Sequence, residues 1–219
     1  MGGFPRRCSH VTVDRRPVTG LAAKATWAVD YDGTIANTNA QKAEWIRRNL
    51  GCEVPSWSCN RTDCIPLIDQ VAYERMADEV YERDSTLQAD EVRGAAVALR
   101  TLSEVGKVYI LTARPRRRME YAREWLSQRG LAALVTDVIT SHGLSKATRC
   151  RAIGASALID DDARHLTASD LGSIARILLQ DGRTDVPPCA PGVMFCHGWA
   201  DVLQEFGLRC ASDGYLIAP

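Results

Sequence analysis

Apolar runs bounded by turn residues recur along the 219-residue chain and alternate with segments of helical periodicity. Each run has about the length of a buried strand and is rich in Val, Ile, Leu and Ala. The runs predict strands over Thr26–Tyr31, Lys107–Thr112, Leu134–Thr140, Ala157–Asp160 and Ala175–Leu179. Because strands of this kind alternate with helices, the pattern favours a doubly wound parallel α/β sheet.

Between the predicted strands, apolar residues recur every three or four positions. This spacing predicts helices over Met119–Arg129, Leu144–Ile153 and Asp162–Leu171. Gly130 and Gly154 follow the first two segments. We expect both glycines to be C-caps, since many helices end in a left-handed residue that glycine adopts readily.

The interval between the first two predicted strands is too long for a simple crossover, at roughly seventy residues. Helical spacing predicts helices at Ala40–Leu50 and Ile68–Arg83. Gly51–Pro66, which is rich in Cys, Pro, Ser and Asn, is a predicted loop. A further predicted helix at Val92–Val105 returns the chain to the sheet.

We interpret residues 35–91 as a small helical cap inserted after the first strand. Residues 25–34 and 92–219 are then the core domain, a Rossmann-like three-layer α/β/α fold with a parallel sheet. Residues 1–24 are polar and basic, and we interpret them as a leader that precedes the first strand.

The composition indicates a globular protein of balanced charge. Hydrophobic residues make up 46% of the chain and charged residues 25%, as in ordinary globular domains. Lys plus Arg and Asp plus Glu both number 27, so no overall basic field would attract nucleic acid. No apolar run approaches the roughly 20 residues of a membrane span. We expect a cytoplasmic protein that does not bind a membrane, and both a monomer and a homodimer stay open.

Eight cysteines are scattered along the chain, and Cys52, Cys59 and Cys64 form its cluster. Their spacings of seven and five residues match no standard zinc pattern. We expect reduced thiols, as is usual in the cytosol. A metal site and a disulfide in this segment stay open as alternatives. His165 and the other histidines show no metal-ligand pattern either, and we assign them no role.

The first predicted strand ends in two aspartates one residue apart, within Val29–Thr34. In an open parallel sheet, ligands bind just outside the carboxyl ends of the strands. Asp30 and Asp32 can address one reacting group there, since alternate side chains of a strand share a face. Two carboxylates this close repel each other unless a cation lies between them, so the motif predicts a metal ion. An acidic turn that only caps a helix is the alternative.

Three further polar elements are predicted to meet this motif at the same edge of the sheet. The second strand ends in Thr112, which Ala113 and Arg114 follow. Lys146 begins a helix after the third strand, and the fourth strand ends in the acidic triplet Asp160–Asp162. Taken singly, Thr112 is also compatible with an ordinary strand-end hydroxyl and Lys146 with a solvated lysine.

Together these residues supply every group that phosphoryl transfer needs. A carboxylate can attack phosphorus and form an aspartyl-phosphate. A second carboxyl can protonate the leaving oxygen and later activate water. A divalent cation, a lysine and a hydroxyl can neutralise and hold the phosphoryl oxygens. Mg²⁺ prefers carboxylates, carbonyls and water as ligands, so Mg²⁺ is the predicted cofactor.

The order of the four motifs across residues 27–162 resembles that of haloacid dehalogenase-like phosphatases. The resemblance implies that Asp30 is the nucleophile and a metal ligand. Asp32 would be the general acid and base and would give the metal its backbone carbonyl. Asp161 would be a further metal ligand, with Asp160 supporting the metal site.

The same resemblance assigns the phosphoryl-binding groups. Thr112 would bind the phosphoryl group, and Lys146 would stabilise both this group and the nucleophile. Asp162 is either part of the acidic metal site or the cap of a following helix. The substrate-binding residues that we predict are Gly33, Thr34, Ala113 and Arg114.

A finer resemblance, to the cytosolic-type 5′-(deoxy)nucleotidases, covers more of the chain. It rests on Ile68, Tyr73 and Met76, and on residues 111–115, 158–161 and 199–203. It implies a helical cap that closes over a nucleotide. These nucleotidases usually carry a second hydroxyl where this chain has Ala113. Trp57, Arg61 and Tyr73 of the predicted cap are either substrate contacts or ordinary core and surface residues.

We therefore predict a Mg²⁺-dependent phosphomonoester hydrolase. Its partner would be a nucleoside 5′-monophosphate or a similar small phosphorylated metabolite. Arg114 is followed by a basic run, Arg116–Arg118, and either recognises a second anionic group or is a solvated helix start.

Three other functions stay open. The same site could act on a polynucleotide 3′-phosphate, or transfer the phosphoryl group to an acceptor other than water. A non-catalytic binding protein is the alternative of another class. A roofing cap and zero net charge disfavour a polynucleotide, and the intact Asp30 and Asp32 disfavour a silent protein. A dehalogenase needs neither Asp32 nor Mg²⁺, which disfavours that reaction.

Overall fold

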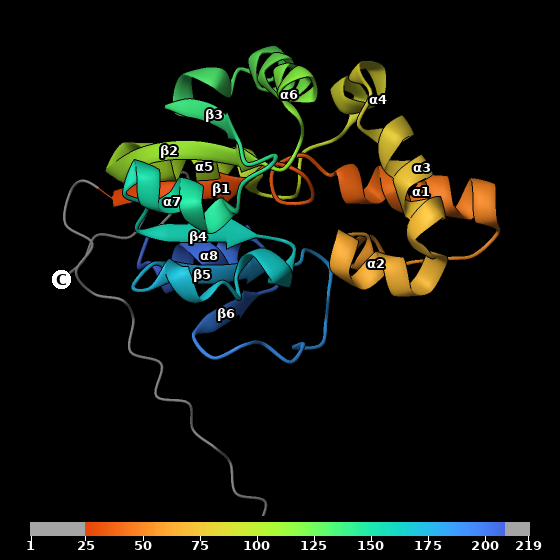
Figure 1. The fold of residues 1–219 in the computed structure, drawn as a ribbon. Coiled ribbons are helices and arrows are strands. Elements are labelled where there is room, and N and C mark those ends of the chain that lie inside the picture. Colours follow the sequence, from red (N-terminus) through yellow and green to blue (C-terminus); the bar gives the residue numbers. More distant parts are fainter. Residues whose placement is uncertain (1–24, 209–219) are drawn as a thin grey trace, which may run out of the picture.

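The structure is a computed structural model that describes residues 25–208 (Figure 1), so the predicted leader at 1–24 lies outside the described residues. The described part contains a six-stranded parallel sheet in the order β3-β2-β1-β4-β5-β6. Its strands are β1 (Ala25–Asp30), β2 (Gly106–Thr112), β3 (Asp137–Thr140), β4 (Ala157–Asp160), β5 (Ala175–Leu179) and β6 (Val193–Cys196). The predicted Rossmann-like parallel α/β sheet is confirmed.

Alternate side chains of the central strand β1 face opposite layers of helices. One layer holds α5 (Ala95–Val105), α6 (Arg116–Gln128) and α8 (Trp199–Glu205), and the other holds α7 (Lys146–Ile153). Trp27 and Val29 belong to the apolar cluster that lies beneath α5, α6 and α8. Ala28 belongs to the cluster beneath α7. Burying a side chain the size of Val29 stabilises the fold by roughly 1.5–3 kcal/mol, so this alternation fixes the register of the strand.

Two buried tryptophans hold the segment that follows β1. Trp125 of α6 packs edge-on against Tyr31, with 5.6 Å between ring centroids, and its Nε1 donates to the Ala89 carbonyl at 2.8 Å. Trp199 of α8 donates from Nε1 to the Thr34 carbonyl at 2.9 Å. The Trp199 bond satisfies a buried backbone carbonyl and so stabilises the turn after the acidic strand, and Trp125 holds the same turn through its contact with Tyr31.

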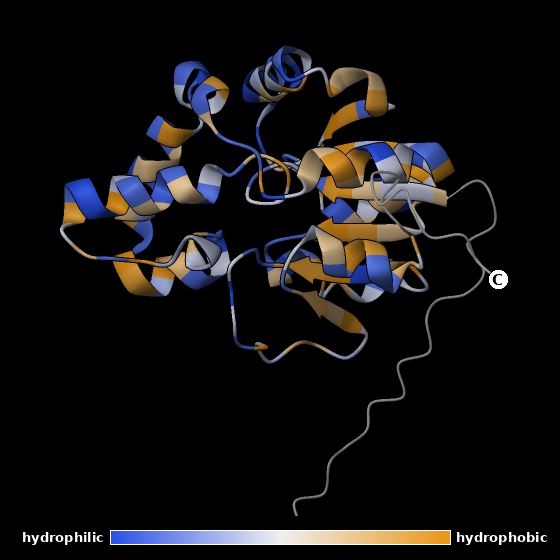
Figure 2. Cartoon of the chain, turned by 180° about the vertical axis from the view of Figure 1, so that it is seen from behind, coloured by the Kyte–Doolittle hydropathy of each residue, from blue (hydrophilic) through white to orange (hydrophobic). Residues whose placement is uncertain are grey.

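Four helices follow β1 and lie beyond the carboxyl ends of the strands (Figure 1). We call them the cap helices. The first three of them enclose an apolar cluster of their own, which includes Ile46, Cys64 and Met76. In Figure 2 the strands are mostly hydrophobic, whereas the cap helices carry hydrophilic residues on their outer faces. The cap helices are α1 (Thr38–Leu50), α2 (Arg61–Ile68), α3 (Gln70–Val80) and α4 (Arg83–Gln88).

The predicted loop at Gly51–Pro66 is partly wrong, because α2 begins inside it at Arg61. Asn60 caps this helix: its side-chain oxygen accepts from the Asp63 backbone N–H at 3.0 Å. A polar segment with a proline at position 66 has the composition of a loop. Its helical state depends on this cap and on the contacts of α2 with α3, which the sequence pattern does not show.

The predicted helix at Asp162–Leu171 is wrong. This segment holds two short 3₁₀ turns, Ala163–His165 and Ser169–Leu171. The Asp162 side chain accepts from the Arg164 backbone N–H at 3.1 Å, which favours a tight local turn. The short elements α4, α8 and β6 lack a long periodic pattern and were not predicted.

Candidate active site

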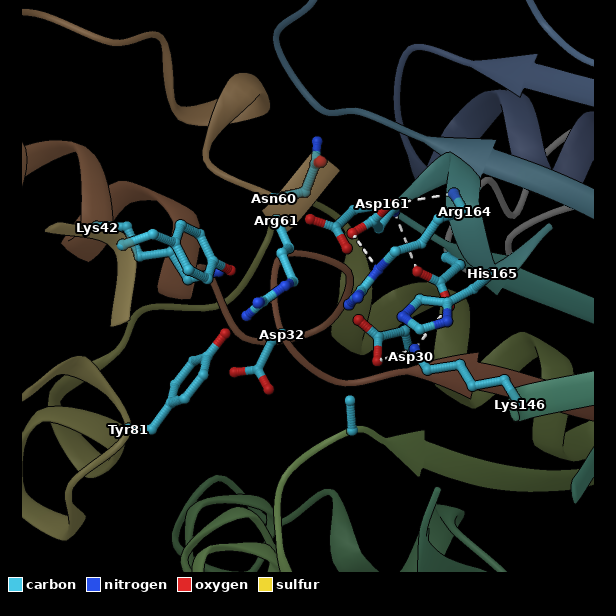
Figure 3. A pocket seen from close by; sticks show the side chains of 14 residues that line it. Asp30, Asp32, Lys42, Asn60, Arg61, Tyr81, Lys146, Asp161, Arg164 and His165 are labelled. Atoms are coloured by element: carbon cyan, nitrogen blue, oxygen red, sulfur yellow. Dashed lines mark hydrogen bonds and ion pairs between the residues drawn. The ribbon is translucent and has the colours of Figure 1, made fainter. Parts of the chain in front are cut away.

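Three neighbouring strands, β2, β1 and β4, carry polar side chains where they end. Asp30 ends β1, Thr112 ends β2 and Asp160 ends β4. Lys146 is the first residue of α7, and Ser145 caps that helix by accepting from the Thr148 backbone N–H at 3.0 Å. The four predicted motifs therefore meet at one edge of the sheet, as Figure 3 shows for Asp30, Asp32, Lys146 and Asp161.

Lys146 binds two of the buried carboxylates. Its Nζ lies 2.5 Å from Asp30 Oδ1 and 2.6 Å from Asp160 Oδ2. Burial alone would lower the pKa of Lys146, but Asp160 and Asp30 outweigh it and raise this pKa, so the ammonium stays charged. Burial raises the pKa of Asp30 to about 7, against the opposing pull of Lys146. A charge-assisted pair of this kind fixes the orientation of the Asp30 carboxylate.

Asp30, Asp160 and Asp161 form a cluster that fits a divalent cation. Each is buried, and each offers one carboxylate oxygen that lies within 4.8 Å of the other two. Burial and the neighbouring carboxylates of Asp30 and Asp160 raise the pKa of Asp161 well above its ordinary value. A cation among these oxygens would remove that repulsion, and hard carboxylate oxygens are what Mg²⁺ prefers.

Hydrogen bonds distinguish the members of the acidic triplet. Asp160 accepts from Lys146 and from the Asp162 backbone N–H. Asp162 accepts from the Thr62 hydroxyl at 2.5 Å and from Arg164, and it caps the following 3₁₀ turn. The Asp161 carboxylate accepts from the Asn39 side-chain amide at 2.6 Å. Within residues 25–208, the Asp161 carboxylate thus accepts one hydrogen bond, against two for Asp160 and three for Asp162, and has the most capacity left for a metal ion.

Asp32 is held by Arg114. The guanidinium binds both carboxylate oxygens, with Nη2 2.7 Å from Oδ1 and Nε 3.0 Å from Oδ2, and Nη1 donates to the Thr86 hydroxyl at 2.6 Å. Burial would raise the pKa of Asp32, but Arg114 outweighs it and holds the pKa below its ordinary value. Asp32 lines the pocket, whereas Arg114 lies behind it. Substrate binding by Arg114 stays a prediction.

The remaining predicted site residues lie around these groups. Gly33 has a φ of +76° and directly abuts Asp161. Thr34 is fully buried, and its carbonyl accepts from Trp199. Thr112 is also fully buried, and its hydroxyl accepts from the Arg114 backbone N–H at 3.1 Å. Ala113 lines the pocket itself.

The pocket also contains residues that the sequence patterns did not single out. Lys42 comes from α1, Asn60 and Tyr81 from the ends of cap helices, and Arg164 and His165 from the turn after β4 (Figure 3). One signal for Lys42 was present: Asn39 and Lys42 are three residues apart and therefore share a helix face. Arg61 and Tyr73, which the sequence left open, line the pocket as well.

No protein-family profile and no curated protein sequence matches the chain. Solved structures do. A predicted phosphoglycolate phosphatase from Haemophilus somnus superposes with a TM-score of 0.56 at 15% identity, covering 84% of this chain and 99% of that one. A haloacid dehalogenase-like hydrolase from Deinococcus radiodurans, with bound phosphate and sodium, gives 0.54 at 14% identity and covers 87% and 100%.

A third structure, the haloacid dehalogenase-like hydrolase YfnB from Bacillus subtilis bound to magnesium, gives a TM-score of 0.54 at 13% identity over 84% and 98% of the two chains. The chain has the haloacid dehalogenase-like fold. At these identities the likeness concerns the fold alone. Among residues 25–208, no helix has the length and apolar character needed to cross a membrane. The finer resemblance to 5′-nucleotidases stays a prediction.

Proposed function

We propose that this protein is a Mg²⁺-dependent phosphomonoester hydrolase that works through an aspartyl-phosphate on Asp30. The observation that carries the proposal is the position of Asp30 at a strand end. It is bound by Lys146 at 2.5 Å and lies within 4.8 Å of Asp161, and Asp32 lines the same pocket. A nucleophile, a proton donor and charge neutralisation are therefore together.

In the first step, a carboxylate oxygen of Asp30 attacks phosphorus and forms an acyl phosphate, while the bond from phosphorus to the ester oxygen breaks. Arg114 keeps Asp32 ionised in the free protein, so Asp32 would take up the proton that a monoanionic ester brings and pass it to the ester oxygen. The product then leaves as an alcohol. In the second step, Asp32 takes a proton from water as the water attacks phosphorus. The acyl phosphate bond then breaks, which restores Asp30 and releases inorganic phosphate.

Other residues of the site would orient the reacting groups and neutralise the charge on the phosphoryl oxygens. Lys146 holds Asp30 Oδ1 and brings a positive charge to the developing phosphoryl charge. Thr112 and the Ala113 backbone would hold phosphoryl oxygens, as the motif order implies. Arg114 holds Asp32 against the pocket.

The metal site fits the same reaction. The Asp30 and Asp161 carboxylates would hold Mg²⁺, together with the Asp32 backbone carbonyl. When bound, the cation would neutralise charge on the phosphoryl oxygens. Asp160 would support the site, since its oxygens already accept from Lys146 and the Asp162 backbone.

A nucleoside 5′-monophosphate is one candidate substrate. The observation that favours it is that Tyr73 and Tyr81, both aromatic, line the pocket. A polynucleotide is disfavoured, because Thr62 and Asn39 of the cap helices bond directly to Asp162 and Asp161 and close the strand edge. Transfer to an acceptor other than water uses the same first step, and product analysis with added alcohols distinguishes it from hydrolysis.

A screen of phosphate monoesters with Mg²⁺, run on the wild type and on Asp30→Asn, tests the proposal. We expect the wild type to release phosphate from at least one ester, and EDTA followed by added Mg²⁺ to abolish and restore this release. Asp30→Asn should lower kcat by at least about a thousandfold. The proposal is wrong if no ester is hydrolysed, or if Asp30→Asn retains full activity.

A further inference from the structure

Lys42 is a buried cation in α1 that lines the pocket. Lys42 is only 2% exposed. Its Nζ donates to Asn39 Oδ1 at 3.0 Å and to the Cys59 carbonyl at 3.2 Å, both neutral acceptors. Within residues 25–208, no carboxylate oxygen lies within 4.0 Å of Lys42 Nζ, the largest distance for an ion pair. The carboxylates of Asp161 and Asp32 attract the Lys42 ammonium only from beyond that distance. Because buried charges are normally paired in direct contact, we expect an anion to bind next to Nζ.

Aromatic rings of the cap hold the Lys42 ammonium in place. Nζ lies 5.3 Å from the centre of the Tyr81 ring and 6.0 Å from that of Tyr73. Such contacts offset part of the loss of hydration. An ammonium has three N–H donors, and the Asn39 and Cys59 oxygens use two of them. One donor is therefore left for a group inside the pocket.

Arg61 brings a second cation to the same wall. It is the first residue of α2, and its guanidinium carbon lies 5.4 Å from the centre of the Tyr73 ring. The one ion pair that Arg61 forms with a described residue, Glu74, is long at 3.9 Å, and both side chains are exposed. An exposed pair of this kind contributes little, so Arg61 is available to another anion.

The two cations face the side of the pocket where the leaving group would lie. Figure 3 shows Lys42 and Tyr81 on one side, Lys146 and His165 on the other, and Asp32 with Arg61 between them. In the proposed reaction the phosphoryl group is at Asp30 and Lys146, and Asp32 protonates the ester oxygen. The rest of the substrate then extends from Asp32 toward Lys42 and Arg61.

We propose that Lys42 and Arg61 bind a second anionic group, a carboxylate or a phosphate, on the leaving-group side of the substrate. The substrate class is then a small phosphomonoester with a second negative charge. This inference rests on the proposed function, which decides which end of the substrate leaves. A nucleoside would leave Lys42 without an anion in direct contact, and Arg114 cannot take the place of Lys42 because Arg114 is bound to Asp32.

Matched pairs of esters test this inference. One pair is 3-phosphoglycerate and glycerol 3-phosphate, which differ in a carboxylate. The other is glucose 1,6-bisphosphate and glucose 1-phosphate, which differ in a second phosphate. We expect kcat/KM of the wild type to be at least about tenfold higher for the anionic member of one pair, and that pair identifies the anion.

Lys42→Met and Arg61→Met should each shrink this preference at least about fivefold, mainly through KM of the anionic ester. Lys107→Met is the matched control, because Lys107 is exposed at the start of β2. It should keep the wild-type preference. Arg61 is 37% exposed, so its variant tests the inference even if Lys42→Met does not fold.

A binding measurement separates this inference from the proposed reaction. In titrations of the Asp30→Asn variant, 3-phosphoglycerate or the bisphosphate should bind at least about tenfold more tightly than its partner ester. If the wild type hydrolyses no ester, the proposed function fails, and the binding ratio still tests the anion site. Equal binding and equal kcat/KM within both pairs overturn the inference, as does a preference that survives both substitutions.

Discussion

Single residues at the acidic motif are constrained by their closest neighbours. At Gly33 the backbone has a φ of +76°, and a Cβ would lie 2.2 Å from Asn39 Nδ2 and 2.4 Å from Asp161 Oδ2. Both atoms belong to the hydrogen bond that orients Asp161. A side chain at Gly33 therefore cannot be added without moving a proposed metal ligand.

Gly33→Ala should accordingly abolish most activity and lower the free energy of unfolding. Gly51→Ala is the matched control, since Gly51 also has a positive φ, of 68°, but nothing lies within 4 Å of an added Cβ. The control should cost about 1–2 kcal/mol from backbone strain alone and should keep its activity. Denaturant unfolding and phosphate release measure both effects. Equal losses in the two variants would show that the contact with Asp161 is unimportant.

His165 gives the stability a defined dependence on pH. Burial lowers its pKa from 6.5 to about 4. Between these values the unfolded chain binds the proton more readily than the folded one, so stability falls as pH drops from about 6.5 to about 4. His165→Gln removes this contribution and should lose less stability between pH 7 and pH 5 than the wild type. Urea unfolding at the two pH values measures this loss of stability. His142→Gln is the control, because His142 is exposed. An equal loss of stability in His165→Gln and in the wild type would refute the assignment.

At the scale of elements, the cap helices α1, α2 and α3 are stabilised by an apolar cluster separate from those of the sheet. Met76 of α3 is fully buried in this cluster, whereas Val71, on the same helix, is 69% exposed. Met76→Ala should lower the free energy of unfolding by about 2–5 kcal/mol, and Val71→Ala should change it by less than about 0.5 kcal/mol. Chemical denaturation of both variants checks this. Similar small effects would mean that the cap is not packed as described.

The elements also show which sequence signals were sufficient to predict the strands and the residues of the site. Ala157–Asp160 is buried at every position, and a continuous apolar run with acidic residues at its end could be recognised directly. The order of motifs then placed Asp30, Lys146 and Asp160 at one edge, where the structure brings them together. Only the parallel topology was needed for that prediction.

Other features depend on contacts that no local pattern contains. Asp162–Leu171 has helical spacing, but Asp162 bonds to the Arg164 backbone and to Thr62 across the site, so the segment forms tight turns. The position of Lys42 depends on how α1 packs over the strand edge, which the periodicity of α1 does not determine. The bidentate pair of Arg114 with Asp32 joins residues that are 82 positions apart, and for the same reason the sequence did not predict it.

At the scale of the whole molecule, hydrogen bonds join the cap helices to the sheet edge. The Thr62 hydroxyl donates to Asp162, and the Asn39 amide donates to Asp161. Gln180, just after β5, donates to the Asp63 carboxylate at 3.3 Å and to the Asp161 carbonyl at 3.2 Å. These bonds close the cap helices over the strand edge, which would exclude bulk water from an acyl phosphate.

Thr62→Val should weaken this closure, because it leaves one Asp162 oxygen without its donor from the cap. We expect a higher KM and faster hydrogen exchange of α2 amides, with far-ultraviolet circular dichroism unchanged. Thr167→Val is the control, since that exposed hydroxyl donates to the Arg164 carbonyl and does not reach the cap. If α2 exchanges at the same rate in both variants, the Thr62 bond does not hold the cap closed.

The central claim is that Asp30 becomes phosphorylated during the reaction. Acid quenching during steady-state turnover of a hydrolysed ester, followed by proteolysis and mass spectrometry, tests it most directly. The account predicts a peptide with Asp30 that carries one phosphoryl group, labile to hydroxylamine, and absent from Asp30→Asn treated in the same way. Turnover without any phosphorylated Asp30 peptide, or a phosphoryl group on another residue, would contradict the account.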